Sequence, residues 1–249
     1  MSDRLGQVAA ELAANRDLPL DLLGLCCELG VGFRVGAADG NRRGALMRRG
    51  SAWEVVLMRR DPYPAAVSPH ERFTIAHELG HYMLMRETAF CRQRQADYWL
   101  GEDLCNHFAS RLLIPDRLLT CLEEPKSSVE LARVVSYIAS SAGVTFEPAA
   151  RAVTSRLATR VAIGTFRLDP WPSTRRLGFR GWWVENRPWW GARGGRRLAI
   201  YADHALAPIL QRMRTMRPGE TVAPDLAGAL STRLRRRPGT SASFAALLA

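Results

Sequence analysis

The chain has 249 residues, 47% of them hydrophobic, and a formal net charge of +11. This length can bury a core, and it suits one large domain or two small ones. No stretch approaches the roughly 18 uninterrupted apolar residues of a membrane-spanning helix, and the N-terminal segment lacks the apolar run of a signal peptide. We therefore expect a cytoplasmic protein with no membrane partner.

The five cysteines are odd in number, and none forms a C-x-x-C pair. This pattern argues against a disulfide framework and against a zinc site built from four cysteines.

The positive charge is concentrated in one part of the chain. Residues 1–150 hold 17 basic and 19 acidic side chains, whereas residues 151–249 hold 18 basic and 5 acidic ones. A basic half indicates an acidic partner, with DNA as the first candidate. Alternatively, the charge reflects a general preference for arginine at positively charged surface positions, because every basic residue except Lys126 is an arginine.

Apolar periodicity and turn residues predict an α+β fold in which helices dominate the first part of the chain. We expect two helices within 4–30, then a short strand at 33–35 and a hairpin. Long helices follow from Ser68 to about Met85 and from about Tyr98 to Leu113. The remaining predicted elements are a short helix at 116–122, helical structure at 127–157 with a break at 142–145, the hairpin strands 44–47 and 53–58, and short strands at 161–163, 178–179 and 198–201.

The shift from helix to strand near residue 158 coincides with the shift in charge. We therefore predict three parts, residues 1–125, a helical segment 126–158, and a basic α/β part at 159–249. Residues from about 235 are expected to form a disordered tail.

The helix that starts after Ser68 carries an H-E-x-x-H pattern, from His77 to His81. Residues four apart lie on the same helix face, so both imidazoles can reach one metal ion. Two histidine ligands suit zinc and leave room for a third protein ligand and a water. Glu78 points to a neighbouring face and can act as the catalytic base. The alternative is two surface or core histidines on an ordinary helix.

Spacing alone leaves the third ligand open. Glu102 lies on the second long helix, with Asn106 one turn later on the same face, where its amide could orient a metal-bound histidine. The alternative for Glu102 is an exposed glutamate favoured by the helix dipole. Other downstream candidates are Glu87, Asp97, Asp103 and His107.

The motifs together resemble the ImmA/IrrE family of metallopeptidases. The resemblance is carried by Arg72–His81, by Glu102–Ala109 and by Leu112–Pro115, whose sequence is L-L-I-P. It implies a zincin-like peptidase domain and makes Glu102 the third zinc ligand, while His107 stands at a position where the family varies. The radiation-response members are the most similar, since they also carry a cysteine directly before the asparagine.

The resemblance also implies a partner and a domain order. Members cleave a helix-turn-helix repressor and so induce DNA-damage or mobile-element genes. The similar members continue into a helix-turn-helix-like segment and a GAF-like sensory domain, which would correspond to residues 126–158 and 159–249.

Two segments beyond the motifs have alternative interpretations. Ile138–Ala149 resembles the core of a helix-turn-helix, with Gly143 at the turn and Thr145 as the next cap, but an ordinary helical hairpin fits equally. Trp182–Trp190 holds four tryptophans that could stack on bases, although a hairpin covering a small core is the simpler interpretation.

Two functions follow from these patterns. The first is a zinc-dependent endopeptidase, in which manganese is also compatible with histidine and carboxylate ligands. The second is a DNA-binding or ligand-sensing regulator whose metal site is structural or inactive. Glu78 favours the enzyme, because a structural zinc site needs no general base. The sequence does not identify an oxyanion stabiliser; Tyr82 and Tyr98 are near the motifs in sequence alone.

Overall fold

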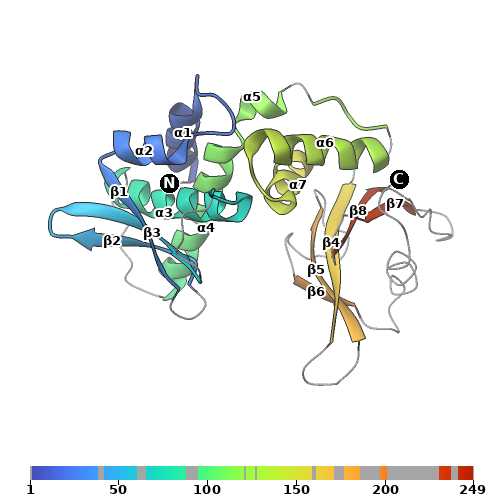
Figure 1. Ribbon diagram of the computed structural model, residues 1–249. Coiled ribbons are helices and arrows are strands. Elements are labelled where there is room, and N and C mark those ends of the chain that lie inside the picture. The colour runs from blue at the N-terminus through green and yellow to red at the C-terminus, as the bar shows by residue number, and fades with distance from the viewer. Residues whose placement is uncertain are drawn as a thin grey trace. The chain divides into compact units, whose positions relative to one another are not determined.

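The protein is described by a computed structural model (Figure 1). The structure describes residues 2–38, 42–60, 66–87, 95–120, 122–126, 128–158, 161–170, 177–185, 197–200, 230–236 and 241–248. The chain divides into two compact units. The first comprises Met1–Thr120 with Ile138–Thr145, and the second comprises Cys121–Tyr137 with Phe146–Ala249.

The first unit has an α+β fold that is mostly helical and contains a small sheet, as the sequence predicts. Its elements are α1 (Ser2–Ala13), α2 (Leu22–Glu28), β1 (Val31–Ala37), β2 (Gly44–Arg49), β3 (Ala52–Arg59), α3 (Pro69–Glu87), α4 (Gln95–Leu113) and α5 (Asp116–Leu119). The second long helix begins at Gln95, slightly before the predicted start at Tyr98.

The sheet has the order β1-β3-β2, so the longest strand lies in the centre. β3 pairs in parallel with β1 and antiparallel with β2. Arg49 pairs with Ala52, which leaves a two-residue loop whose first residue, Gly50, has a φ of 60°. A glycine is favoured there because a side chain would be strained at positive φ. The predicted hairpin is therefore confirmed.

Helix α3 lies in the core of this unit, in contact with β2 and β3 and with α4. Its buried side chains are apolar apart from one glutamate; they are Ile75, Ala76, Glu78, Leu79, Met83 and Leu84. α4 supplies the facing apolar side chains Leu104, Phe108, Leu112 and Leu113, and α1 packs against α4. Among the described residues, no helix is long and apolar enough to cross a membrane.

The second unit contains α7 (Phe146–Thr154) and a sheet of the order β6-β5-β4-β8-β7. Its strands, all paired antiparallel, are β4 (Val161–Pro170), β5 (Leu177–Glu185), β6 (Arg197–Ile200), β7 (Leu230–Arg236) and β8 (Ser241–Leu248). α7 packs against β4 and β5. α6 (Ser128–Ala142) has residues in both units, and Gly143 after it has a φ of 61°. The GAF-like assignment stays a prediction.

The disordered tail expected from about residue 235 stays a prediction; β8 and the end of β7 fall in this segment. β8 occupies an interior position because it pairs with both β4 and β7. Its sequence, SASFAALL, is uncharged and rich in small and apolar residues. A strand with neighbours on both sides needs no charged side chains to protect an open edge.

Candidate metal centre

Helix α3 places His77 and His81 on one face, one turn apart. A capping box fixes where the helix starts: the Ser68 backbone N–H donates to the Glu71 carboxylate at 2.8 Å, and the Glu71 N–H donates to the Ser68 hydroxyl at 3.3 Å. The two imidazole rings meet edge to face with centroids 4.8 Å apart. Both side chains are largely buried, with 15% and 14% of their surfaces exposed.

Glu102 on α4 faces both imidazoles. Its Oε2 lies 3.2 Å from Nε2 of His77, and its Oε1 lies 3.5 Å from Nε2 of His81. The three residues form a cluster whose possible ligand atoms all lie within 4.8 Å of one another. Two ligands of a tetrahedral zinc ion at about 2.05 Å would stand roughly 3.3 Å apart. The donor set and its spacing therefore fit a divalent metal such as zinc.

The other ring nitrogens of both histidines contact α4 as well. Nδ1 of His77 lies 3.0 Å from Oδ1 of Asn106, as expected if the ring N–H donates to the amide oxygen. Nδ1 of His81 lies 3.1 Å from Sγ of Cys105. The sequence singled out Asn106 for this position, but it did not assign a role to Cys105.

The two helices approach closely at the centre of the motif. A β-carbon added to Gly80 would lie 3.0 Å from Cα and 3.2 Å from the carbonyl oxygen of Cys105. A glycine between the two histidines thus lets the backbone of α4 come near enough for its side chains to reach both rings. The H-E-x-x-H pattern leaves this position unspecified.

Glu78 is the buried charged residue of this site, with 9% of its surface exposed. It lies beside the start of β2: a β-carbon on Gly44 would stand 3.3 Å from Oε1 of Glu78 and 2.5 Å from Cγ2 of Thr74. Gly44 is distant in sequence and belongs to no motif, so no sequence signal indicated its contact with Glu78.

The first turn of α3 is tied to the sheet and to the segment between α1 and α2. Nε and Nη2 of Arg59 donate to the two oxygens of Glu71 at 2.6 and 3.0 Å. The Arg59 guanidinium, assisted by Ser68, lowers the pKa of Glu71 to about 2. Arg72 donates to the carbonyl of Leu20 at 2.7 Å, and burial lowers its pKa. These contacts hold the helix that carries the histidines.

Among the described residues, the remaining metal-ligand candidates are not part of the cluster. The Tyr82 hydroxyl donates to the carbonyl of Leu29 at 3.3 Å, and Tyr98 is exposed and stacks edge to face against Trp99. Nε2 of His107 lies beside Gly6 of α1. The candidate ligand Glu87 pairs with Arg4, and His70, near the start of α3, contacts Arg43. His204 and residues 186–190 of the tryptophan-rich segment lie outside the described residues, as do the side chains of β5.

Comparisons with known proteins agree with the geometry. Residues 65–154, which include α3 and α4, match a peptidase family described as the IrrE N-terminal-like domain. A solved structure described as a Mycobacterium tuberculosis transcriptional regulator is similar in fold, with a TM-score of 0.51 and 13% identity. The similarity covers 98% of this chain and 76% of that one. No curated protein matches the chain.

Proposed function

We propose, from the premise that residues 65–154 belong to the IrrE N-terminal-like peptidase family, that this chain is a metal-dependent endopeptidase. The observation that carries the proposal is the cluster of His77, His81 and Glu102, with Glu78 adjacent on the same helix. Two histidines and a glutamate leave a coordination position for water, as catalytic zinc sites do.

Bound at this cluster, zinc or manganese would polarise the scissile carbonyl and activate the attacking water. Glu78 takes the proton of that water and delivers it to the leaving amine. Its low exposure keeps the carboxylate away from bulk solvent, and Gly44 leaves the space in which the carboxylate lies.

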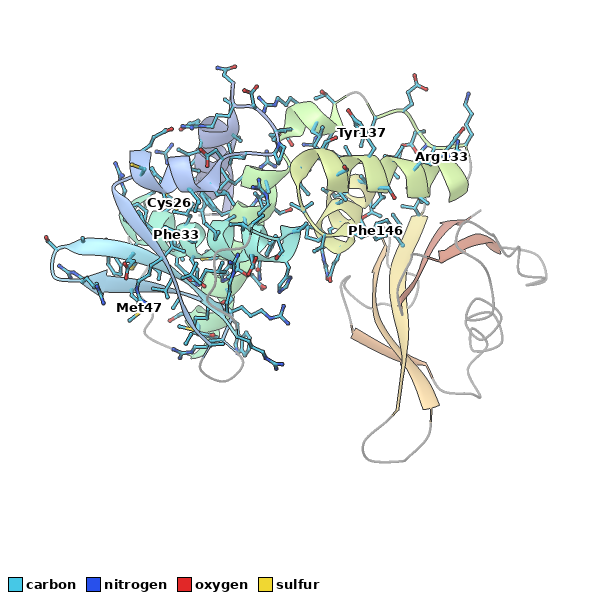
Figure 2. The ribbon with its side chains drawn as sticks, viewed as in Figure 1. Cys26, Phe33, Met47, Arg133, Tyr137 and Phe146 are labelled. Atoms are coloured by element: carbon cyan, nitrogen blue, oxygen red, sulfur yellow. The ribbon has the colours of Figure 1, made fainter. Side chains whose placement is uncertain are left out.

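A protein substrate is supported by the surface next to the cluster. Among the described residues, β2 pairs with β3 alone, so its other edge can accept an extended peptide. β2 starts beside Glu78 and carries the exposed Met47 (Figure 2). Trp99, with 62% of its surface exposed, lies about one helical turn before Glu102 on α4. Both features suit a polypeptide better than a small molecule.

The substrate that we propose is a helix-turn-helix transcriptional repressor, whose cleavage would induce DNA-damage or mobile-element genes. This part follows from the family resemblance of Arg72–His81 and Glu102–Ala109. The test is incubation of zinc-loaded protein with the repressor encoded beside its gene. We expect one cleavage site with the wild type and no cleavage with Glu78→Ala at equal metal content.

Glu87→Ala is the matched control, because Glu87 lies at the end of the same helix and pairs with Arg4 and Arg86 instead of the cluster. It should cleave as the wild type does. Retained cleavage by Glu78→Ala would show that Glu78 is not the base. If neither the wild type nor either variant cleaves the repressor while zinc is bound, a second function is favoured.

That second function is a DNA-binding or ligand-sensing regulator with a structural metal site. It is supported by the net charge of residues 151–249, with 18 basic and 5 acidic side chains, and by the helix-turn-helix resemblance of Ile138–Ala149. Binding to nonspecific duplex DNA that weakens steeply with added salt would support it.

A further inference from the structure

Cys105 is a fully buried residue of α4 whose thiol contacts a proposed metal ligand. Its exposure is 0%, and its Sγ lies 3.1 Å from Nδ1 of His81. The opposite ring nitrogen, Nε2, faces Oε1 of Glu102 at 3.5 Å. The thiol therefore lies behind the histidine, on the side away from the metal cluster.

The same arrangement is found one residue further along for the other histidine. Asn106 contacts Nδ1 of His77 at 3.0 Å, while Nε2 of His77 faces Oε2 of Glu102 at 3.2 Å. Two consecutive residues of α4 thus contact the outer nitrogens of both rings, and Glu102, one turn earlier, faces the inner nitrogens. The side chains of Glu102, Cys105 and Asn106, on one face of α4, therefore contact both ring nitrogens of each histidine.

The position of the proton on the ring decides whether a histidine can bind a metal. A neutral imidazole carries one N–H, and its other nitrogen has a free lone pair. If Nδ1–H of His81 donates to the sulfur, the lone pair is on Nε2, which faces the cluster. If the thiol donates to Nδ1 instead, Nε2 carries the proton and cannot act as a ligand.

We propose that Cys105 is a positioning residue that accepts a hydrogen bond from Nδ1–H of His81 and so holds this ring in its metal-binding tautomer and orientation. The inference rests on the proposed metal site. Sulfur is a weak acceptor, but the site is buried and the contact is short, so Sγ is placed to accept this N–H. The close approach of Gly80 to the Cys105 backbone brings the thiol within reach of the His81 ring.

The test measures zinc affinity of the full chain, with zinc alone as the probe, by competition with a chromophoric chelator. Loss of a partner behind a metal-bound histidine weakens metal binding about 10- to 100-fold, so we expect this rise in the zinc Kd for Cys105→Ala. Cys105→Ser retains an acceptor and should recover most of the affinity. Cys26→Ala is the matched control, because Cys26 is equally buried but lies on α2, and it should bind zinc as the wild type does.

A second measurement does not depend on any variant folding. The ring nitrogen chemical shifts of His81 in the metal-free wild type report its tautomer, and we expect the proton on Nδ1. A proton on Nε2 would overturn the inference, and so would a zinc Kd of Cys105→Ala equal to that of the wild type. If the wild type itself binds zinc no better than His77→Ala, the metal site fails instead, which is a different result.

Discussion

The backbone of Gly44 lies against the side chain of Glu78, closely enough that a β-carbon there would stand 3.3 Å from the carboxylate oxygen Oε1. The same β-carbon would stand 2.5 Å from Cγ2 of Thr74, a distance that requires an atom to move. The first residue of β2 thus limits where the proposed base can lie.

Gly44→Ala should therefore impair proteolysis without removing the metal. The added methyl group displaces Thr74 and Glu78, and a small misplacement of a catalytic group can lower the rate about 100-fold. We expect a lower kcat and an unchanged zinc Kd, measured on the same preparation. Thr74→Ser removes the Cγ2 that the methyl group would meet, so the double variant should regain activity. An active Gly44→Ala protein would place the base elsewhere.

Gly80→Ala tests the close packing of α3 on α4. In a helix, alanine is favoured over glycine by about 1 kcal/mol, but overpacking costs about 1 to 3 kcal/mol. The methyl group would meet backbone atoms of Cys105, which cannot rotate away, so we expect net destabilisation and weaker zinc binding.

The measurement for Gly80→Ala is urea unfolding of the metal-free protein together with the zinc Kd. Gly6→Ala on α1 is the control, because a β-carbon there would meet the ends of the flexible His107 and Arg111 side chains. It should be neutral or stabilising. Equal stability of the two variants would contradict close packing at Gly80.

The contact between Arg59 and Glu71 predicts a pH dependence of stability. The folded pKa of Glu71 is lowered from 4.5 to about 2 by the guanidinium and by Ser68. The pair therefore stabilises the fold above about pH 4.5, and this contribution is lost as the pH falls towards 2. We expect wild type to be more stable than Glu71→Gln at neutral pH, with a difference in urea midpoint that shrinks on acidification.

Metal-free samples of both proteins make this comparison independent of the histidine cluster. Ser68→Ala, which removes the hydroxyl from the capping box, should lower the free energy of unfolding by about 1 kcal/mol at neutral pH. A difference between wild type and Glu71→Gln that stays constant from about pH 7 to about pH 3 would mean that the pKa of Glu71 is not lowered.

Metal removal should destabilise the unit that contains α3 and α4. Zinc at about 100 times its Kd adds about 2.7 kcal/mol to the stability of a protein that binds it only when folded. A chelator should therefore lower the Tm of the wild type in a thermal scan, and added zinc should restore it. His81→Ala should show no such response; a chelator effect of equal size in this variant would indicate zinc bound at other residues.

Local sequence signals predicted the elements that carry the site. The capping box of Ser68 and Glu71 fixes the start of α3 through contacts three residues apart, and helical periodicity alone places His77 beside His81. Both predictions depend on short-range geometry, which a single sequence contains. The start of α4 was predicted less accurately, at about Tyr98 instead of Gln95, because Gln95–Asp97 lacks a comparable capping signal.

Contacts between elements were harder to predict. Glu102 was ambiguous from spacing and was singled out through the family resemblance, and its distances to both histidines agree with that choice. The face shared by Glu102, Cys105 and Asn106 could have been read from the helical period, but not which ring each residue would meet. That depends on the closeness of the two helices at Gly80, and the position of Gly44 depends on the path of the sheet.

The side chains that make and support the cluster come from α3 and α4, which follow each other in the chain. The proposed metal site is therefore encoded between His77 and Asn106, and the elements outside this span act as its supporting scaffold. Because the proposed ligands and their contacts are close together in the sequence, a rearrangement outside this span would not separate a ligand from its partner. Substitutions outside this span, Gly44 apart, can therefore accumulate without removing a proposed ligand or its partner.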